Sequence, residues 1–116
     1  MLLVEKFKAD TILFKEGNND KTMFIILEGD VQLYVTRSGK DLELAVLGKN
    51  DFFGEIEMYG HKTRCMSAKA LTAVRLVIIK NRMQLDQFIG QYPSFSGKIL
   101  RVMGERLALA NVSLQE

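Results

Sequence analysis

The sequence has no tryptophan, one cysteine, one proline and one histidine among its 116 residues. The single cysteine, Cys65, cannot form a disulfide within the chain. The single histidine, His61, cannot supply the several imidazoles of a multi-histidine metal site. We therefore expect a chain that needs neither a disulfide nor a metal, and that belongs in the reducing cytoplasm.

Long apolar runs and charge of one sign are also scarce. Dense apolar stretches such as residues 74–79 are far shorter than the roughly 20 residues that cross a bilayer, which predicts no membrane span. Sixteen basic residues are scattered among fourteen acidic ones without a basic block, which argues against a nucleic-acid partner. No paired carboxylates and no nucleophile with a nearby base stand at useful spacing, so we expect no catalytic residues.

The apolar content of 47% is enough for one compact core, and most of it lies in short β-rich runs between residues 11 and 80. Glycine, asparagine and aspartate separate these runs, as is typical of turns between antiparallel strands. In one run, Val31, Leu33 and Val35 alternate with polar residues and share one face. The expected strands are residues 11–14, 23–27, 31–36, 42–47, 65–71 and 73–79.

Helical patterns are confined to the end of the chain. Asn81 followed by Gln84 resembles a capping box and predicts a helix over about residues 81–92. A second helix is expected over about residues 94–113. Its apolar residues recur at the spacing of a coiled-coil seam, at Leu100, Met103, Leu107, Ala110 and Leu114. A second apolar stripe on the same helix consists of Ile99, Val102 and Leu109. The seam predicts a homodimer through the last helix, although both stripes could instead pack internally.

The residues best suited to chemistry lie in residues 51–68, which read DFFGEIEMYGHKTRCMSA. Gly54 allows close approach of the backbone, and a helix that opens there would direct unpaired N–H groups at an anion. Arg64 can donate two parallel hydrogen bonds to phosphate oxygens. The Glu55 carboxylate can accept a hydrogen bond from a ribose hydroxyl. Phosphate and ribose together indicate a nucleotide.

This segment resembles the phosphate-binding cassette of cyclic-nucleotide-binding domains. Phe53, Gly54, Glu55 and Ile56 match the first half of the cassette, and the second half is matched by Arg64, Cys65, Met66 and Ser67. The residues FKEG at 14–17 and MFIILEGDV at 23–31 are similar to the early strand, glycine turn and hairpin of that family, of the catabolite-activator and kinase-regulatory-subunit type. The resemblance covers nearly the whole chain.

The resemblance implies a single domain over residues 1–116, with a mainly β fold: an antiparallel eight-stranded β-roll over about residues 10–80. Such a roll is a double-stranded, jelly-roll-like β-helix, here flanked by an N-terminal segment and two closing helices. The phosphate would contact Gly54, Ile56, Arg64, Cys65 and Met66, and the ribose would contact Glu55. The lid over the base would draw on Met103, Arg106, Leu107 and Ala110.

The implied function is a regulatory sensor that binds cAMP or cGMP and moves its C-terminal helices toward an unidentified downstream protein. Cys65 slightly favours cAMP, because a thiol is a weaker donor than the hydroxyl that favours cGMP in relatives. Glu57 supports an alternative, a degenerate fold that serves dimerisation or protein interaction without a ligand, because its carboxylate would oppose a phosphate. A transcription regulator would need a helix-turn-helix after the last helix. We expect no such DNA-binding domain within these 116 residues, although a longer protein from which they were taken could contain one.

Overall fold

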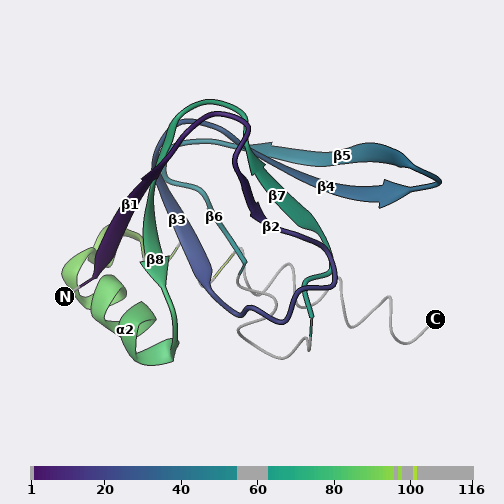
Figure 1. Ribbon diagram of the computed structural model, residues 1–116. Coiled ribbons are helices and arrows are strands. Elements are labelled where there is room, and N and C mark those ends of the chain that lie inside the picture. Colours follow the sequence, from purple (N-terminus) through teal and green to yellow (C-terminus); the bar gives the residue numbers. More distant parts are fainter. Residues whose placement is uncertain (1, 55–62, 96, 98–100, 102–116) are drawn as a thin grey trace.

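The computed structural model describes residues 2–54, 63–95, 97 and 101. The described residues form eight strands and the helix α2 (Arg82–Gln91), as Figure 1 shows. The strands are β1 (Leu3–Phe7), β2 (Ile12–Phe14), β3 (Met23–Glu28), β4 (Val31–Arg37), β5 (Lys40–Leu47), β6 (Phe52–Phe53), β7 (Ser67–Ala70) and β8 (Val74–Ile79). No helix in this described part is long and apolar enough to cross a membrane.

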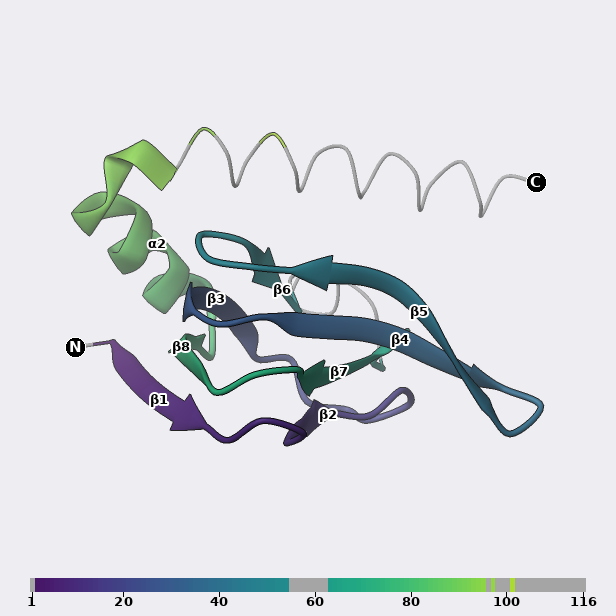
Figure 2. The same cartoon turned by 90° about the horizontal axis from the view of Figure 1, so that it is seen from above.

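The strands form two four-stranded antiparallel sheets. The first sheet has the order β1-β8-β3-β6 and the second has the order β2-β7-β4-β5. The chain passes repeatedly from one sheet to the other, and only β4 and β5 are consecutive neighbours in the same sheet. This crossing makes a roll, whose long β4–β5 hairpin extends to one side in Figures 1 and 2. The predicted fold class, a mainly β antiparallel roll, is confirmed.

The main core fills the space between the two sheets. Phe14, Phe24 and Phe53 meet there, with ring centroids 4.9 to 6.0 Å apart. Val31 and Leu33 of β4 face this core, as their alternation predicts, but the predicted third member Val35 is only half-buried and Tyr34 is buried. A register shift between Leu33 and Tyr34 interrupts the alternation there. The removal of these core side chains from water is the main force that holds the two sheets together.

A second apolar cluster lies on the outer face of the first sheet, where α2 covers it. Leu85 and Phe88 of α2 are buried there among sheet residues Met23, Ile25, Phe52, Val77 and Ile79. The helix begins after Asn81, whose side chain accepts a hydrogen bond of 2.9 Å from the Gln84 backbone N–H. The Gln84 side chain in turn accepts from the Lys80 N–H at 2.7 Å. The predicted cap is therefore present, but the Gln84 side chain accepts from the N–H of Lys80 and not from that of Asn81, as a capping box would have it.

The structure differs from the sequence prediction at three strands. β1 was not expected, and β6 is a two-residue strand inside the cassette segment. The strand expected over 65–71 begins only at Ser67, so Cys65 and Met66 precede it. Of the last predicted helix, over residues 94–113, residues 94, 95, 97 and 101 are helical, as is residue 93 just before it. The other residues of that helix, and every residue of its expected dimer seam from Leu100 to Leu114, lie outside the described residues.

Candidate functional site

Arg64 is the most deeply buried charged residue in the described part of the chain, with 1% of its surface exposed. Its backbone is held by the loop between β2 and β3. The Arg64 N–H donates to the Asn18 carbonyl at 2.8 Å, and the Gly17 N–H donates to the Arg64 carbonyl at 2.8 Å. These two bonds join segments that lie far apart in the sequence and fix the point from which the arginine side chain starts.

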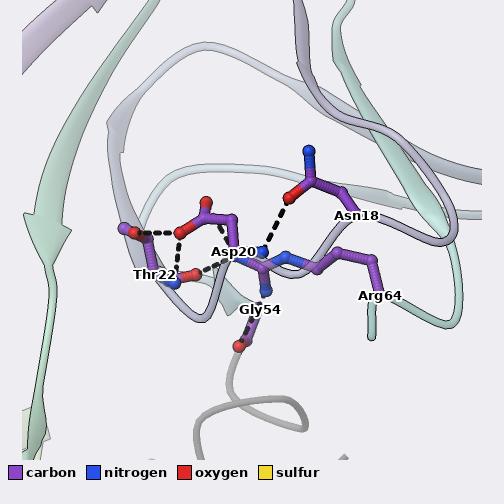
Figure 3. A network of polar contacts seen from close by, with 5 residues as sticks. All are labelled: Asn18, Asp20, Thr22, Gly54 and Arg64. Carbon is purple, nitrogen blue, oxygen red and sulfur yellow. Dashed lines mark hydrogen bonds and ion pairs between the residues drawn. The ribbon is translucent and has the colours of Figure 1, made fainter. Parts of the chain in front are cut away.

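The guanidinium of Arg64 is surrounded by oxygen atoms, as Figure 3 shows. Nη1 donates to the Gly54 carbonyl at 3.1 Å. Nη2 donates to the Thr22 carbonyl and also lies 3.3 Å from Oδ2 of Asp20. Three chain segments therefore meet at one side chain: the β2–β3 loop, the end of β6 and the start of β7.

The aromatic core supports the same guanidinium from one face. Cζ of Arg64 lies 4.0 Å from the centroid of the Phe14 ring. A cation over an aromatic face is stabilised by the ring quadrupole, and more strongly when water is excluded. The Phe14 ring is itself packed against Phe24 and Phe53. The position of the charge is therefore fixed by the core as well as by hydrogen bonds.

Asp20 supplies the negative charge in this arrangement. Its Oδ1 accepts from the backbone N–H of Thr22 at 3.1 Å and from the Thr22 hydroxyl at 2.7 Å. Partial burial raises the pKa of Asp20, but the hydrogen bonds from Thr22 and the charge of Arg64 outweigh burial and hold the pKa below its ordinary value. Asp20 is therefore ionised at neutral pH and neutralises part of the charge of Arg64.

Gly54 stands where a side chain would not fit. Its φ is +86°, and a Cβ added there would lie 2.6 Å from the Thr22 carbonyl oxygen and 2.9 Å from Nη1 of Arg64. L-residues disfavour this φ, and the nearby backbone cannot easily move away. The glycine is thus required for the approach of β6 to the arginine.

The predicted site residues fall into two groups. Gly54 and Arg64 are brought into direct contact, while Cys65 and Met66 are half-buried beside the arginine, Met66 against the main core. The structure does not describe the other predicted residues, which are Glu55, Ile56, Met103, Arg106, Leu107 and Ala110. Glu57 and His61 also lie outside the described residues. Within the described part, no group of three or more His, Cys, Asp and Glu residues lies together as a metal would need.

Sequence reasoning missed the partners of Arg64. Asp20 ends the turn predicted over residues 17–20, Thr22 lies between that turn and the strand expected over 23–27, and Phe14 was identified only as a strand residue. Ser67, predicted as part of the cassette, is buried and its Oγ accepts from the Glu16 N–H at 2.9 Å. An acidic residue in a turn gives no local sign that it pairs with a distant arginine.

The sequence pattern of the cyclic nucleotide-binding domain family matches residues 4–92 of this chain. The chain therefore belongs to the cyclic nucleotide-binding domain family, which confirms the resemblance seen in residues 51–68. The matched residues include both sheets of the roll and the contact between Gly54 and Arg64.

Three similar proteins illustrate the range of the family. The CRP-like cAMP-activated global transcriptional regulator of Mycobacterium tuberculosis is 31% identical over 111 residues, which cover 95% of this chain and 49% of the regulator. The catabolite activator protein of Thermus thermophilus has the same fold, with a TM-score of 0.76 at 23% identity, covering 98% of this chain and 54% of that one. The cAMP-bound EAL enzyme Bd1971 has a TM-score of 0.70 at 27% identity, covering 97% of this chain and 30% of that one. This chain thus spans about half the length of the regulators it matches.

Proposed function

We propose that this chain is a cyclic-nucleotide sensor domain, which binds cAMP or cGMP and converts binding into movement of its C-terminal helices without catalysing a reaction. The observation that carries the proposal is the contact between Gly54 and Arg64 at 3.1 Å in a chain of this family. A similar regulator is named as cAMP-activated, which favours cAMP as the ligand. The similar EAL enzyme Bd1971 has been solved both with cAMP and with cGMP bound, so it supports either nucleotide.

In this proposal the cyclic phosphate binds at the cassette, near Gly54, Ile56, Arg64, Cys65 and Met66. Glu55 accepts a hydrogen bond from the ribose, and the base lies under a lid drawn from Met103, Arg106, Leu107 and Ala110. Arg64 suits the phosphate because its charge is permanent and its planar fork can bond two oxygens at once. The last helix would also carry the dimer contact and the surface for a downstream protein.

The charge balance around Arg64 suggests how binding would be felt by the rest of the chain. Among the contacts described above, Asp20 is the one anion beside the guanidinium, at 3.3 Å. A phosphate at this cation would compete with Asp20 for it. The β2–β3 loop, which Asp20 and Thr22 join to the arginine, would then respond to the ligand.

A second candidate function is supported by the burial of Arg64. Its side chain is 0% exposed and already donates hydrogen bonds to two carbonyls. An arginine so engaged can serve the fold alone, as in a domain that kept the roll for dimerisation or protein interaction and lost its ligand. The two candidates differ in one measurable property, which is saturable nucleotide binding.

Calorimetric titration of cAMP and then cGMP into the nucleotide-free protein tests the proposal. Arg64→Lys keeps the charge and removes the planar fork, and Arg37→Lys makes the same change at an exposed arginine of the β4–β5 hairpin. We expect Arg64→Lys to weaken nucleotide binding by about tenfold or more, because charge-assisted bonds contribute roughly 1.5–3 kcal/mol. Arg37→Lys should bind as the wild type does.

The titration also separates the alternatives. No heat from folded wild-type protein with either nucleotide would favour the interaction module. Weaker binding in Arg37→Lys with unchanged binding in Arg64→Lys would reject Arg64 as the phosphate ligand. A cavity beside Arg37, lined also by Lys15 and Ser67, would then be the site to test.

A further inference from the structure

A cavity of about 410 Å³ lies on the outer face of the first sheet, between that sheet and α2. Its walls come from Val4 of β1, Leu27 of β3 and Val77 of β8 on one side. Phe88 of α2 and the following Tyr92 line the other side. Cavities that hold small molecules occupy roughly 300–1,000 Å³, so this one is of suitable size.

Three aromatic rings form the helix side of the cavity. The Phe88 ring lies 4.9 Å from Tyr92 and 5.4 Å from Phe95 between centroids, the second pair edge to face. Phe88 is buried, whereas half of Tyr92 is exposed. A planar ligand group would extend this ring cluster and cover its exposed edge, and aromatic pairs of these geometries are favourable beyond their buried area.

No charged side chain occurs among the described residues that line the cavity. Removing a charge from water without a partner is costly, so such a lining selects against a charged ligand. The polar side chains of the lining are the amides of Asn50 and Gln91 and the hydroxyl of Tyr92. Each of them can both donate and accept a hydrogen bond. The lining therefore fits an uncharged molecule with an aromatic body and at least one hydrogen-bonding group.

The first sheet separates this cavity from Arg64. Neighbouring residues of β3 point to opposite faces: Phe24 packs in the core with Phe14, over which Arg64 lies, and Ile25 pairs with Val77 on the outer face. Figure 1 shows α2 beside the ends of β1 and β8, on the outer side of that sheet. Gly54, Arg64, Cys65 and Met66, the described residues proposed for the cyclic phosphate, are therefore absent from the lining of the cavity.

We propose that this cavity is a second ligand site, which binds a small uncharged aromatic molecule between α2 and the first sheet. The bound molecule contacts Tyr92 and Val4 at once, and so holds the helix against the sheet. None of the described residues that line the cavity belongs to the proposed nucleotide site, so binding there can be measured in nucleotide-free protein. Ligand bound only to the folded chain also raises the midpoint of thermal unfolding.

The fluorescent probe N-phenyl-1-naphthylamine tests the site, because it has aromatic rings, one N–H donor and no charge. Titration into the whole wild-type chain should give a saturable signal and a raised unfolding midpoint. Val4→Trp fills the cavity from β1 and should weaken probe binding by about tenfold or more, since the probe loses its apolar contact area. Val46→Trp is the matched control, because Val46 is 50% exposed on the edge strand β5 and Val4 is 46% exposed on the edge strand β1.

A second variant and a second probe keep the test sharp. Tyr92→Ala removes one exposed wall of the cavity and should weaken the probe several-fold even if Val4→Trp fails to fold. Anilinonaphthalene sulfonate has a similar ring body with a negative charge, and should bind at least about tenfold more weakly than the uncharged probe. The proposal is overturned if the wild type gives no saturable signal, if folded Val4→Trp and Tyr92→Ala both bind like the wild type, or if the charged probe binds equally well.

Discussion

Two arginine–carboxylate pairs in this chain have similar geometry and very different surroundings. Nη2 of Arg64 lies 3.3 Å from Asp20, and Nη1 of Arg37 lies 3.0 Å from Glu16. The Arg64 side chain is 0% exposed, and the Arg37 side chain, on the β4–β5 hairpin, is 56% exposed. The comparison teaches that distance alone does not rank such pairs, because burial and the number of further partners set what each one contributes.

The physical reason lies in what water can replace. If Arg37 loses Glu16, water solvates both charges at once, which is why exposed pairs contribute little to stability. Arg64 cannot be solvated in this way, because the Phe14 ring and the carbonyls of Gly54 and Thr22 enclose it. Buried charges that lose their partners are among the most destabilising changes. The predictions below test this difference from its largest expected effect to its smallest.

Arg64→Ala should have the largest effect on stability. The change removes the donor to the Gly54 and Thr22 carbonyls and leaves space over the Phe14 ring. Lost bonds to buried groups and the cavity together should lower the free energy of unfolding by about 3–5 kcal/mol. Urea unfolding followed by circular dichroism measures this. A loss below about 1 kcal/mol would show that the burial of Arg64 does not stabilise the fold.

Gly54→Ala should have the next largest effect, because the added Cβ meets the Thr22 carbonyl and Arg64 itself. Gly39→Ala is the matched control: its φ is +76°, against +86° at Gly54, and an added Cβ there meets nothing within 4 Å. We expect the control to cost about 1 kcal/mol from backbone conformation alone, and Gly54→Ala to cost about 2–3 kcal/mol. Equal losses in urea unfolding would mean that the crowding beside Arg64 is relieved cheaply.

Asp20→Asn separates the charge of the pair from its shape. Since the pKa of Asp20 lies below its ordinary value in the folded chain, its ionised form stabilises the fold at any pH above about 4. That stability is lost as the pH falls from about 4 through the folded pKa. Between pH 5 and 8, we expect the free energy of unfolding of the wild type to exceed that of Asp20→Asn by about 1 kcal/mol, a value already reduced for the exposure of Asp20. The difference should shrink as the pH falls below about 4, and a difference that stays constant from neutral pH into acid would contradict the role of the charge.

Features that depend on residues close together in the sequence could be predicted from it. Asn81 and Gln84, which form the helix cap, are three positions apart in the sequence, so a local pattern was enough to find the cap. The cassette, too, is a short motif, and it led to Gly54 and Arg64. The alternation in β4 predicted the burial of Val31 and Leu33, but not the buried Tyr34 that follows the register shift in this strand.

Features that depend on distant contacts were not predictable. Asp20 and Arg64 are 44 residues apart, and nothing in either local sequence indicates the other. β1 has mostly exposed side chains and is a strand because its backbone pairs with β8, near the other end of the roll. The short β6 is likewise defined by its pairing with β3. In each case the partner that fixes the structure is supplied by the tertiary fold.

Arg37→Ala should have the smallest effect on stability. The loss of the ion pair should instead be visible in the pKa of its partner, Glu16. The hydrogen bond and charge of Arg37 hold the pKa of Glu16 below its ordinary value. Removing Arg37 should return that pKa upward, which NMR titration of the Glu16 carboxyl carbon can follow. The urea midpoint at pH 7 should stay within error of the wild type, because water replaces the lost contact. If Arg37→Ala instead destabilised the chain as much as Arg64→Ala, exposure would not be what distinguishes the two pairs, and their similar distances would be the better guide.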